Sequence, residues 1–373
     1  MSAVNSTAEL STKDLWTLAK HAANSDAKKT TTQLQGIENT MIVVGSKGSG
    51  KTTIILRQTD RDEAPSPTSA LEYTQVEHFH THVNNCQYLF QNIYRFARRT
   101  RGMTGVKDVV HMWEVAGGVR LSDLVKIPIV EAQVHTITCV IVVDLSQPDS
   151  ITSTLDHFIT LFAERVESLL SGLEKRGSKR PAALRKQAWK KYGVDHPDQS
   201  ELKPSLVPLV IIGSKYDVFR DFESETRKLV CKTLRYAAHV FGASLIFTSA
   251  KDETSMERCR QLLSHHGFKS NPPKGHIIDH NKAMMVLAGA DTLSQIGHPT
   301  KSDKESIGRV KGLDWNMWKT VYSQSLPPRN VQDDSLKDIV DLAKYREPAI
   351  DNVYGQKEAE FMQRMERQSQ PQR

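Results

Sequence analysis

A glycine-rich segment near residue 45 carries the residue types that bind phosphate. Gly45 to Thr52 reads GSKGSGKT and matches G-x-x-x-x-G-K-[ST] at every position. Glycines permit a turn that points backbone N–H groups inward, Lys51 can reach the β- and γ-phosphates, and the Thr52 hydroxyl can ligate Mg²⁺. We predict a phosphate loop formed by Gly45, Ser46, Lys47, Gly48, Ser49, Gly50, Lys51, Thr52 and Thr53.

Two later segments indicate a guanine base. IIGSKYD resembles the N-K-x-D element of guanine-nucleotide proteins, with Lys215 and Asp217 in place and Ser214 where asparagine is usual. TSAK resembles the S-A-K element that backs the base, which adds Ser249, Ala250 and Lys251. Both segments follow apolar runs, and ligands of parallel sheets bind at the carboxyl ends of the strands. We expect GTP or GDP with Mg²⁺ at Thr52, and an adenylate-type kinase would lack both elements.

The groups that would hydrolyse this nucleotide are less complete. Ras-like proteins end their third strand with D-x-x-G followed by a glutamine that orients water. In WEVAGGV, Glu114 replaces the aspartate, Gly117 keeps its place and Gly118 stands where the glutamine would be. The switch threonine is either Thr68 or Thr74. We predict retained binding with impaired hydrolysis, and a degenerate loop that binds nothing is an alternative.

Other polar residues admit two interpretations each. His78, His80 and His82 alternate along HFHTH, so they could share a strand face and ligate a metal, or line a solvated or partner-facing surface. Asp144 ends the apolar run VIVVD, where it could imitate a Walker-B carboxylate or cap the following turn. We favour the surface and the turn.

The elements that position these residues alternate between strand and helix. The segments TMIVVG, VVHMWEVAG, TCVIVVDLS, VPLVIIGSK and SLIFTSAK are near-continuous apolar runs, typical of parallel strands buried on both faces. EYTQVEHFHTHV is predicted to be an edge strand. Helical patterns lie at residues 52–57, 150–170, 221–241 and 255–266. The fold class is therefore α/β, a mainly parallel doubly wound sheet with helices on both faces.

The chain divides by pattern into three parts. Residues 1–38 contain a helix that starts after Ser11, then a polar linker. Residues 39–267 form the nucleotide-binding domain, and residues 268–373 are a partly helical extension. In this extension Trp315, Trp318 and Tyr322 share one helical face, which either binds a partner or packs on the domain.

Composition limits the function classes. The chain has 373 residues and a net charge of +7, and the segment 172–204 holds nine Lys/Arg against four Asp/Glu. This basic insertion is either a solvated loop or a contact surface, and the near-neutral remainder argues against nucleic acid. No apolar run approaches the roughly 20 residues of a membrane span. Cys86, Cys139, Cys231 and Cys259 lie far apart, so we expect buried reduced thiols in a cytosolic setting.

These segments together resemble the dynein light intermediate chain family, in its cytoplasmic dynein 2 branch. The resemblance rests on VVGSKGSGKTTIILR, ALEYT, HMWEVAGG, IIGSKYDVF, DLWTLAK and YREPAIDNVY. It implies a Ras-like P-loop domain in a non-catalytic subunit that docks onto the dynein 2 heavy-chain tail. Implied further partners are other dynein 2 subunits and intraflagellar transport particles, in the cytoplasm, the cilium and its basal body. The alternative is an active small-GTPase-like switch.

Overall fold

The computed structural model describes residues 38–61, 63–68, 70–79, 107–193, 196–298, 314–328 and 347–369. The chain forms a compact unit that ends at Pro328 and a second unit from Arg329, whose described part is helix α13 (Pro348–Ser369). The predicted N-terminal helix, Cys86, His80 and His82 lie outside the described residues. Among the described helices, none combines the length and apolar character that crossing a bilayer requires.

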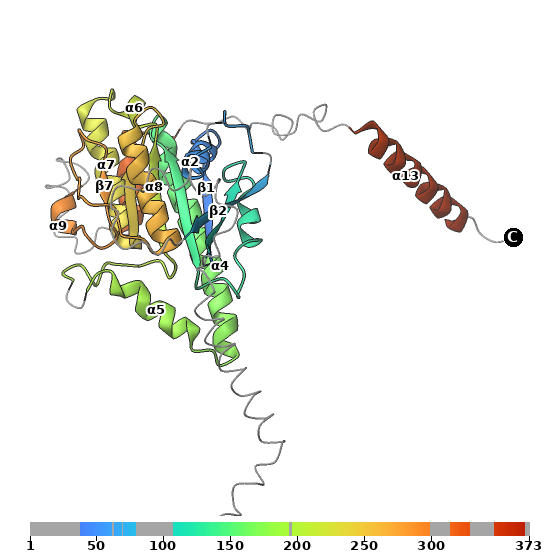
Figure 1. The fold of residues 1–373 in the computed structure, drawn as a ribbon, viewed down its shortest axis with the longest axis horizontal. Coiled ribbons are helices and arrows are strands. Elements are labelled where there is room, and N and C mark those ends of the chain that lie inside the picture. Colours follow the sequence, from blue (N-terminus) through green and yellow to red (C-terminus); the bar gives the residue numbers. More distant parts are fainter. Residues whose placement is uncertain are drawn as a thin grey trace, which may run out of the picture. The chain divides into compact units, whose positions relative to one another are not determined.

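A seven-stranded sheet forms the centre of the compact unit (Figure 1). Its order is β2-β3-β1-β4-β5-β6-β7, and only the edge strands β2 and β7 run antiparallel to their neighbours. The bounds are β1 Glu38–Gly45, β2 Leu71–Phe79, β3 Lys107–Val115, β4 Ile137–Asp144, β5 Leu209–Ser214, β6 Ala243–Phe247 and β7 Met285–Val286. The predicted mainly parallel sheet and the edge position of β2 are confirmed. Strand β7 was missed because two residues are too short to show a period.

Helices cover both faces of this sheet. One face carries α2 (Lys51–Gln58) and α8 (Glu253–Phe268), and the other carries α4 (Ile151–Lys175) and α7 (Ser224–Phe241). These four match the predicted helical patterns. Short helical turns connect the layers: η1 Ser122–Lys126, η2 Pro148–Ser150, α6 Tyr216–Phe219 and α9 Leu293–Ile296.

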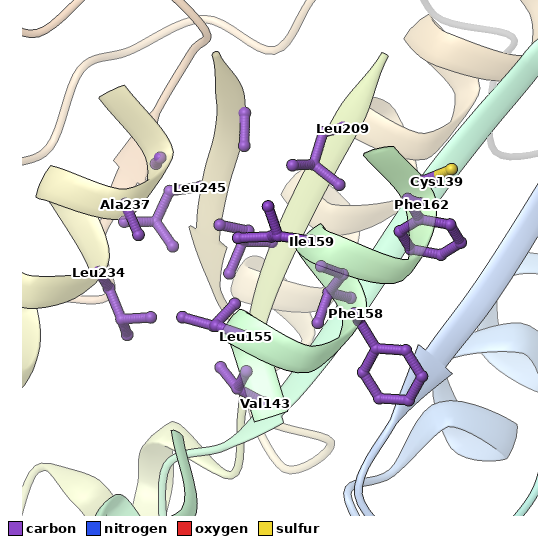
Figure 2. Packing of buried hydrophobic residues seen from close by; sticks show 14 of the residues in the cluster. Cys139, Val143, Leu155, Phe158, Ile159, Phe162, Leu209, Leu234, Ala237 and Leu245 are labelled. Carbon is purple, nitrogen blue, oxygen red and sulfur yellow. The ribbon is translucent and has the colours of Figure 1, made fainter. Parts of the chain in front are cut away.

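Strand alternation divides the core into two clusters. Met41, Val43 and Ile54 belong to the cluster under α2 and α8, whereas Ile42 and Val44 belong to the cluster under α4 and α7. Figure 2 shows the second cluster, where Leu155 and Ile159 of α4 meet strand residues such as Val143, Leu209 and Leu245. Every residue of β4 is buried. Burial on both faces explains why the strands read as continuous apolar runs.

The described cysteines match the expectation. Cys139, Cys231 and Cys259 are free and buried, and burial raises the pKa of each thiol. A high pKa leaves little thiolate at neutral pH, so these thiols are chemically inert packing residues.

The basic segment 172–204 is not a solvated loop, as one prediction had it. Helix α4 extends to Lys175 and α5 (Arg180–Lys190) folds back beside it. Leu184 and Ala188 of α5 are buried, and Arg185 pairs with Glu167 at 2.6 Å and also with Glu174. The loop interpretation is wrong because apolar residues spaced four apart give α5 a packing face. The contact-surface interpretation stays a prediction.

Helix α11 (Trp315–Ser325) packs on the core, so the partner-binding interpretation of its aromatic face is wrong. Trp318 is 1% exposed and its ring lies 4.5 Å from that of Tyr236 in α7. Trp315 Nε1 donates to Asp156 Oδ1 at 2.8 Å, and the Tyr322 hydroxyl donates to the Pro148 carbonyl at 2.6 Å. The compact unit therefore continues past residue 267, where the sequence analysis ended the nucleotide-binding domain.

Replacing Trp318 by alanine should destabilise the compact unit by about 3–5 kcal/mol, because it removes a buried aromatic side chain and leaves a cavity. Chemical denaturation of the full chain measures this loss. Thr320→Ala, an exposed change on the same helix, is the control and should cost well under half as much. Equal losses for the two variants would contradict the packing described for α11.

Candidate nucleotide-binding site

The phosphate loop connects β1 to α2 in a strained path that glycine permits. Gly45 has φ +149°, and a Cβ there would lie 2.0 Å from the Val142 carbonyl oxygen of β4. Gly50 caps α2 with φ +85°. The chain therefore leaves β1 close beside β4 and presents the backbone N–H groups at the start of α2, which favours an anion.

Lys51 lies inside this loop. Its Nζ donates to the carbonyl oxygens of Gly45 at 3.3 Å and Ser46 at 3.0 Å, and the residue is buried. Burial lowers the pKa of Lys51, and the nearby Glu114 carboxylate partly offsets this. A phosphate group here would gain a cation that has already been withdrawn from water, where charge pairing is strong.

Thr52, Glu114 and Thr68 converge at the end of the loop. The Thr52 hydroxyl donates to Glu114 Oε1 at 2.8 Å, and Thr68 Oγ1 lies 3.4 Å from Thr52 Oγ1. Burial raises the pKa of Glu114, while the hydrogen bond from Thr52 and the charge of Lys51 act to lower it. The structure thus brings Thr68 to the site, whereas Thr74 lies in β2 opposite Met112. Hydroxyl and carboxylate oxygens suit Mg²⁺.

Gly117 and Gly118 follow β3, and Gly118 borders the phosphate loop. Both have positive φ, at +69° and +59°, and a Cβ on Gly118 would lie 3.5 Å from the Lys47 backbone nitrogen. A side chain at position 118 would contact the phosphate loop, but glycine has no side chain. The position that a glutamine would need for orienting water therefore carries no polar group.

Two contacts of the loop were missed by sequence reasoning. Ser46 Oγ lies 3.0 Å from Thr154 Oγ1 of α4, and the Thr68 hydroxyl donates to Glu72 at 3.2 Å. No motif marks Thr154 or Glu72, because their roles come from how the sheet and α4 are placed. Ser49 Oγ is buried and has no hydrogen-bond partner within the described part of the chain, which fits a loop built around a ligand.

The second half of the site lies after β5 and β6. Asp217 Oδ1 accepts from Ser249 Oγ at 2.7 Å, and Oδ2 pairs with Lys251 Nζ at 2.8 Å. These hydrogen bonds, from Lys251 and then Ser249, lower the pKa of Asp217. Asp217 is thus an ionised acceptor, as recognition of two guanine N–H groups requires. Lys251 is mostly exposed, so its side chain is free to move aside.

Lys215 takes a different partner. It stands at φ +56° and its Nζ binds Asp144 Oδ2, while Asp144 Oδ1 accepts from the backbone N–H and the hydroxyl of Ser146. The prediction that Asp144 caps the turn after β4 is confirmed. The pairing also fixes Lys215 across the ends of β4 and β5, which no spacing in the sequence indicates.

The phosphate loop and the residues on the base side of the site lie next to each other. Ser214, which replaces the usual asparagine, donates its hydroxyl to the Val143 carbonyl at 3.1 Å, and its Cβ would lie 3.9 Å from a Cβ built on Gly50. An open pocket of about 710 Å³ adjoins Asp217, Ser249 and Lys251, and its wall includes Tyr216 and Phe222. Ala250 is exposed beside it.

The donor set fits a nucleotide and its metal ion. Lys51 and the loop amides would hold phosphate, Thr52 and Glu114 would face Mg²⁺, and Asp217 with Ser249 would receive the base. When bound, the nucleotide would supply a charged ligand that fills the loop. The residues around it bind and orient, and Gly118 contributes no group that could direct water.

Comparison with known proteins gives consistent results. The family model described as dynein light intermediate chain matches residues 106–206. The chain is 40% identical over 330 residues to cytoplasmic dynein 2 light intermediate chain 1 of Bos taurus, covering 87% of each chain. It is 37% identical over 370 residues to that of Danio rerio, covering 95% of each. The human protein of this name is 39% identical over 330 residues.

A solved structure supports the fold. The crystal structure of the conserved domain of dynein light intermediate chain superposes with a TM-score of 0.51, and the match covers 84% of this chain and all of the other. The sequence identity of that match is 16%, so it speaks for the fold alone.

Glu114→Gln should make the nucleotide-free protein more resistant to urea than wild type, and this difference should grow as pH rises. The folded pKa of Glu114 lies above its ordinary 4.5, so its contribution to stability is present below about pH 4.5 and is lost as pH rises through the folded pKa. A glutamine side chain can still accept the hydrogen bond from the Thr52 hydroxyl, but it has no negative charge that burial would remove from water. Urea unfolding from pH 4 to 8 measures the difference from wild type.

The control for this prediction is Glu72→Gln, which removes a carboxylate that solvent reaches. It should not show the gain. A constant difference between Glu114→Gln and wild type at all pH values would contradict the desolvation of Glu114.

Proposed function

The chain belongs to the dynein light intermediate chain family, and from this premise we propose that it serves as an accessory subunit of a dynein 2 motor, not as the ATPase. The observation that carries this proposal is the extent of similarity. Relatives named cytoplasmic dynein 2 light intermediate chain 1 align over 87–95% of both chains, so the similarity extends over most of the chain and is not confined to one motif.

In this proposal the subunit binds and stabilises the heavy-chain tail for retrograde intraflagellar transport and cilium assembly. It works with other dynein 2 subunits and transport particles in the cytoplasm, the cilium and its basal body. The aromatic face of α11 is buried, so docking must use other residues. Val119, Ile127 and Val130 are exposed apolar side chains in one segment beside η1. Apolar side chains clustered on a surface are typical of interfaces.

The segment from Val119 to Val130 is also held rigidly. Arg165 of α4 donates from Nη2 and Nε to the Ile129 carbonyl at 2.9 and 3.2 Å, and Nη2 also reaches the Lys126 carbonyl at 3.2 Å. Val125 and Ile129 are fully buried beneath it. A surface that is fixed before binding loses little conformational entropy on association, which favours affinity.

Capture of this subunit by a purified dynein 2 heavy-chain tail tests the proposal. Ile127→Asp with Val130→Asp should lower the affinity at least tenfold, because a charge would enter an apolar contact. Ile278→Asp, an exposed apolar residue elsewhere, is the matched control. Melting temperatures of both variants should stay near that of wild type. Failure of the tail to capture the wild-type chain would contradict the accessory role itself. Full capture of the double variant would show that docking uses a surface other than the segment from Val119 to Val130.

The nucleotide site serves mainly to stabilise the fold. A bound ligand stabilises the native state by RT ln(1 + [L]/Kd), about 2.7 kcal/mol when its concentration is 100 times Kd. A loop that buries Lys51 and leaves Ser49 Oγ without a partner would gain from such a ligand. The second candidate function is a working switch, which the approach of Thr68 to Thr52 favours. Gly118 argues against it.

Nucleotide analysis and Lys51→Ala separate these two functions. We expect guanine nucleotide in the supernatant of the denatured protein, and single-turnover GTP hydrolysis no faster than on the order of 10⁻⁴ to 10⁻³ per second. For a structural ligand, Lys51→Ala should lower the melting temperature and, through it, heavy-chain capture. Near-stoichiometric adenine nucleotide would exclude the role given to Asp217.

The contrary outcomes are equally specific. Hydrolysis near 1 per second without a partner would mean that another group replaces the missing glutamine. A Lys51→Ala protein with unchanged melting temperature and capture, but without transport in cells, would identify the loop as a switch.

A further inference from the structure

Three metal-capable side chains meet outside the nucleotide site. His196 and Asp198 follow α5, and His239 lies near the end of α7, 41 residues beyond Asp198. One ligand atom from each lies within 4.8 Å of the other two. His239 Nε2 is 2.9 Å from Asp198 Oδ2, and His196 Nδ1 is 3.9 Å from the same oxygen. Two ligands bonded to Zn²⁺ at about 2.0–2.1 Å in a tetrahedron are about 3.3 Å apart, between these two values.

The cluster is shielded from water. The His239 side chain is fully buried, and those of His196 and Asp198 are 9% and 14% exposed. The Tyr192 ring packs edge-on against both imidazoles, at 5.5 Å from His196 and 5.9 Å from His239.

Among the described residues, the ion pairs of Asp198 are with His196 and His239. Asp291, the next carboxylate nearby, forms a buried bidentate pair with Arg235 at 2.6 and 2.7 Å and is thereby neutralised. Lys191 Nζ donates to the Gly242 carbonyl at 2.7 Å. Asp198 and two neutral histidines would carry one negative charge, and a divalent ion would leave the cluster with a single positive charge.

Hydrogen bonds account for only part of this arrangement. Asp198 Oδ2 accepts from His239 and from the Leu293 backbone N–H at 2.9 Å. The Asp198 N–H donates to His196 Nδ1 at 3.2 Å, and an ion bound at that nitrogen would replace this hydrogen bond. His239 Nδ1 is buried without a hydrogen-bond partner among the described residues, so Nε2, beside Asp198, is the nitrogen that would face the ion. The His239–Asp198 bond also does not require a second imidazole at 5.2 Å from the first.

We propose that His196, Asp198 and His239 form a binding site for Zn²⁺. Two imidazoles with one carboxylate favour zinc over Mg²⁺ or Ca²⁺, which prefer oxygen ligands. The ion would join the segment after α5 to α7, and through the Leu293 contact of Asp198 to α9. Bound there, the ion would stabilise the fold by linking segments that lie far apart in the sequence.

Zinc titration of the full chain tests this site. Chelator-treated protein is titrated with Zn²⁺ against a chromogenic chelator, and Co²⁺ replaces Zn²⁺ for absorption spectroscopy. We expect one equivalent bound with a micromolar or lower Kd, a higher melting temperature with Zn²⁺, and the intense visible bands of tetrahedral Co²⁺. His196→Ala keeps the His239–Asp198 bond and should weaken Zn²⁺ binding at least tenfold.

Two controls make the result specific. His280→Ala removes a histidine that lies 3.7 Å from Asp279 but has no third ligand in the described residues, and it should bind Zn²⁺ like wild type. His80→Ala with His82→Ala removes two of the three alternating histidines of HFHTH; both lie outside the described ranges, whereas His78 lies in β2. The proposal is overturned if wild type binds no Zn²⁺ at tens of micromolar, if His196→Ala binds as tightly as wild type, or if the His80 and His82 double variant alone abolishes binding.

Discussion

The close approach of Gly45 to the Val142 carbonyl fixes where β1 can end and the phosphate loop can begin. Gly45 pairs with Val142 in the β1–β4 register, and no side chain fits between them. On the other side of β1, Val43 pairs with Glu114 of β3. The β1–β4 register positions the start of the loop, and the β1–β3 register brings the Glu114 carboxylate beside Thr52.

The candidate site combines parts of very different electrostatic character. At the phosphate loop, Lys51 and Glu114 are both buried, and each loses charge stabilisation that the other only partly restores. At the base side, Asp217 is ionised and its partner Lys251 is exposed. An anionic ligand therefore gains most at the loop, where a buried cation has few competing partners. Such a division suits retention of nucleotide better than its turnover.

Sequence reasoning succeeded where local pattern dictates geometry. Continuous apolar runs predicted strands buried on both faces, and the parallel order placed Asp217 near Ser249, which hydrogen-bond at 2.7 Å. It failed where the outcome depends on tertiary placement. Thr68 and Thr74 were equivalent in sequence, and only the path of the segment before β2 brings Thr68 to Thr52. Helix α5 was missed as a packed element because its basic residues outweigh its narrow apolar face, and Trp318 gave no sign of which surface it covers.

The position of α11 has a consequence for the order in which the chain can fold during synthesis. Tyr322 reaches back 174 residues to Pro148, and Trp315 reaches back 159 residues to Asp156. Pro148 and Asp156 leave the ribosome long before α11 does. Until α11 is synthesised, the Tyr236 ring and the surface around α7 therefore stay exposed to solvent. Contacts of such separation slow folding and prolong exposure of apolar surface. A nascent chain halted before residue 315 would therefore be a natural substrate for chaperones.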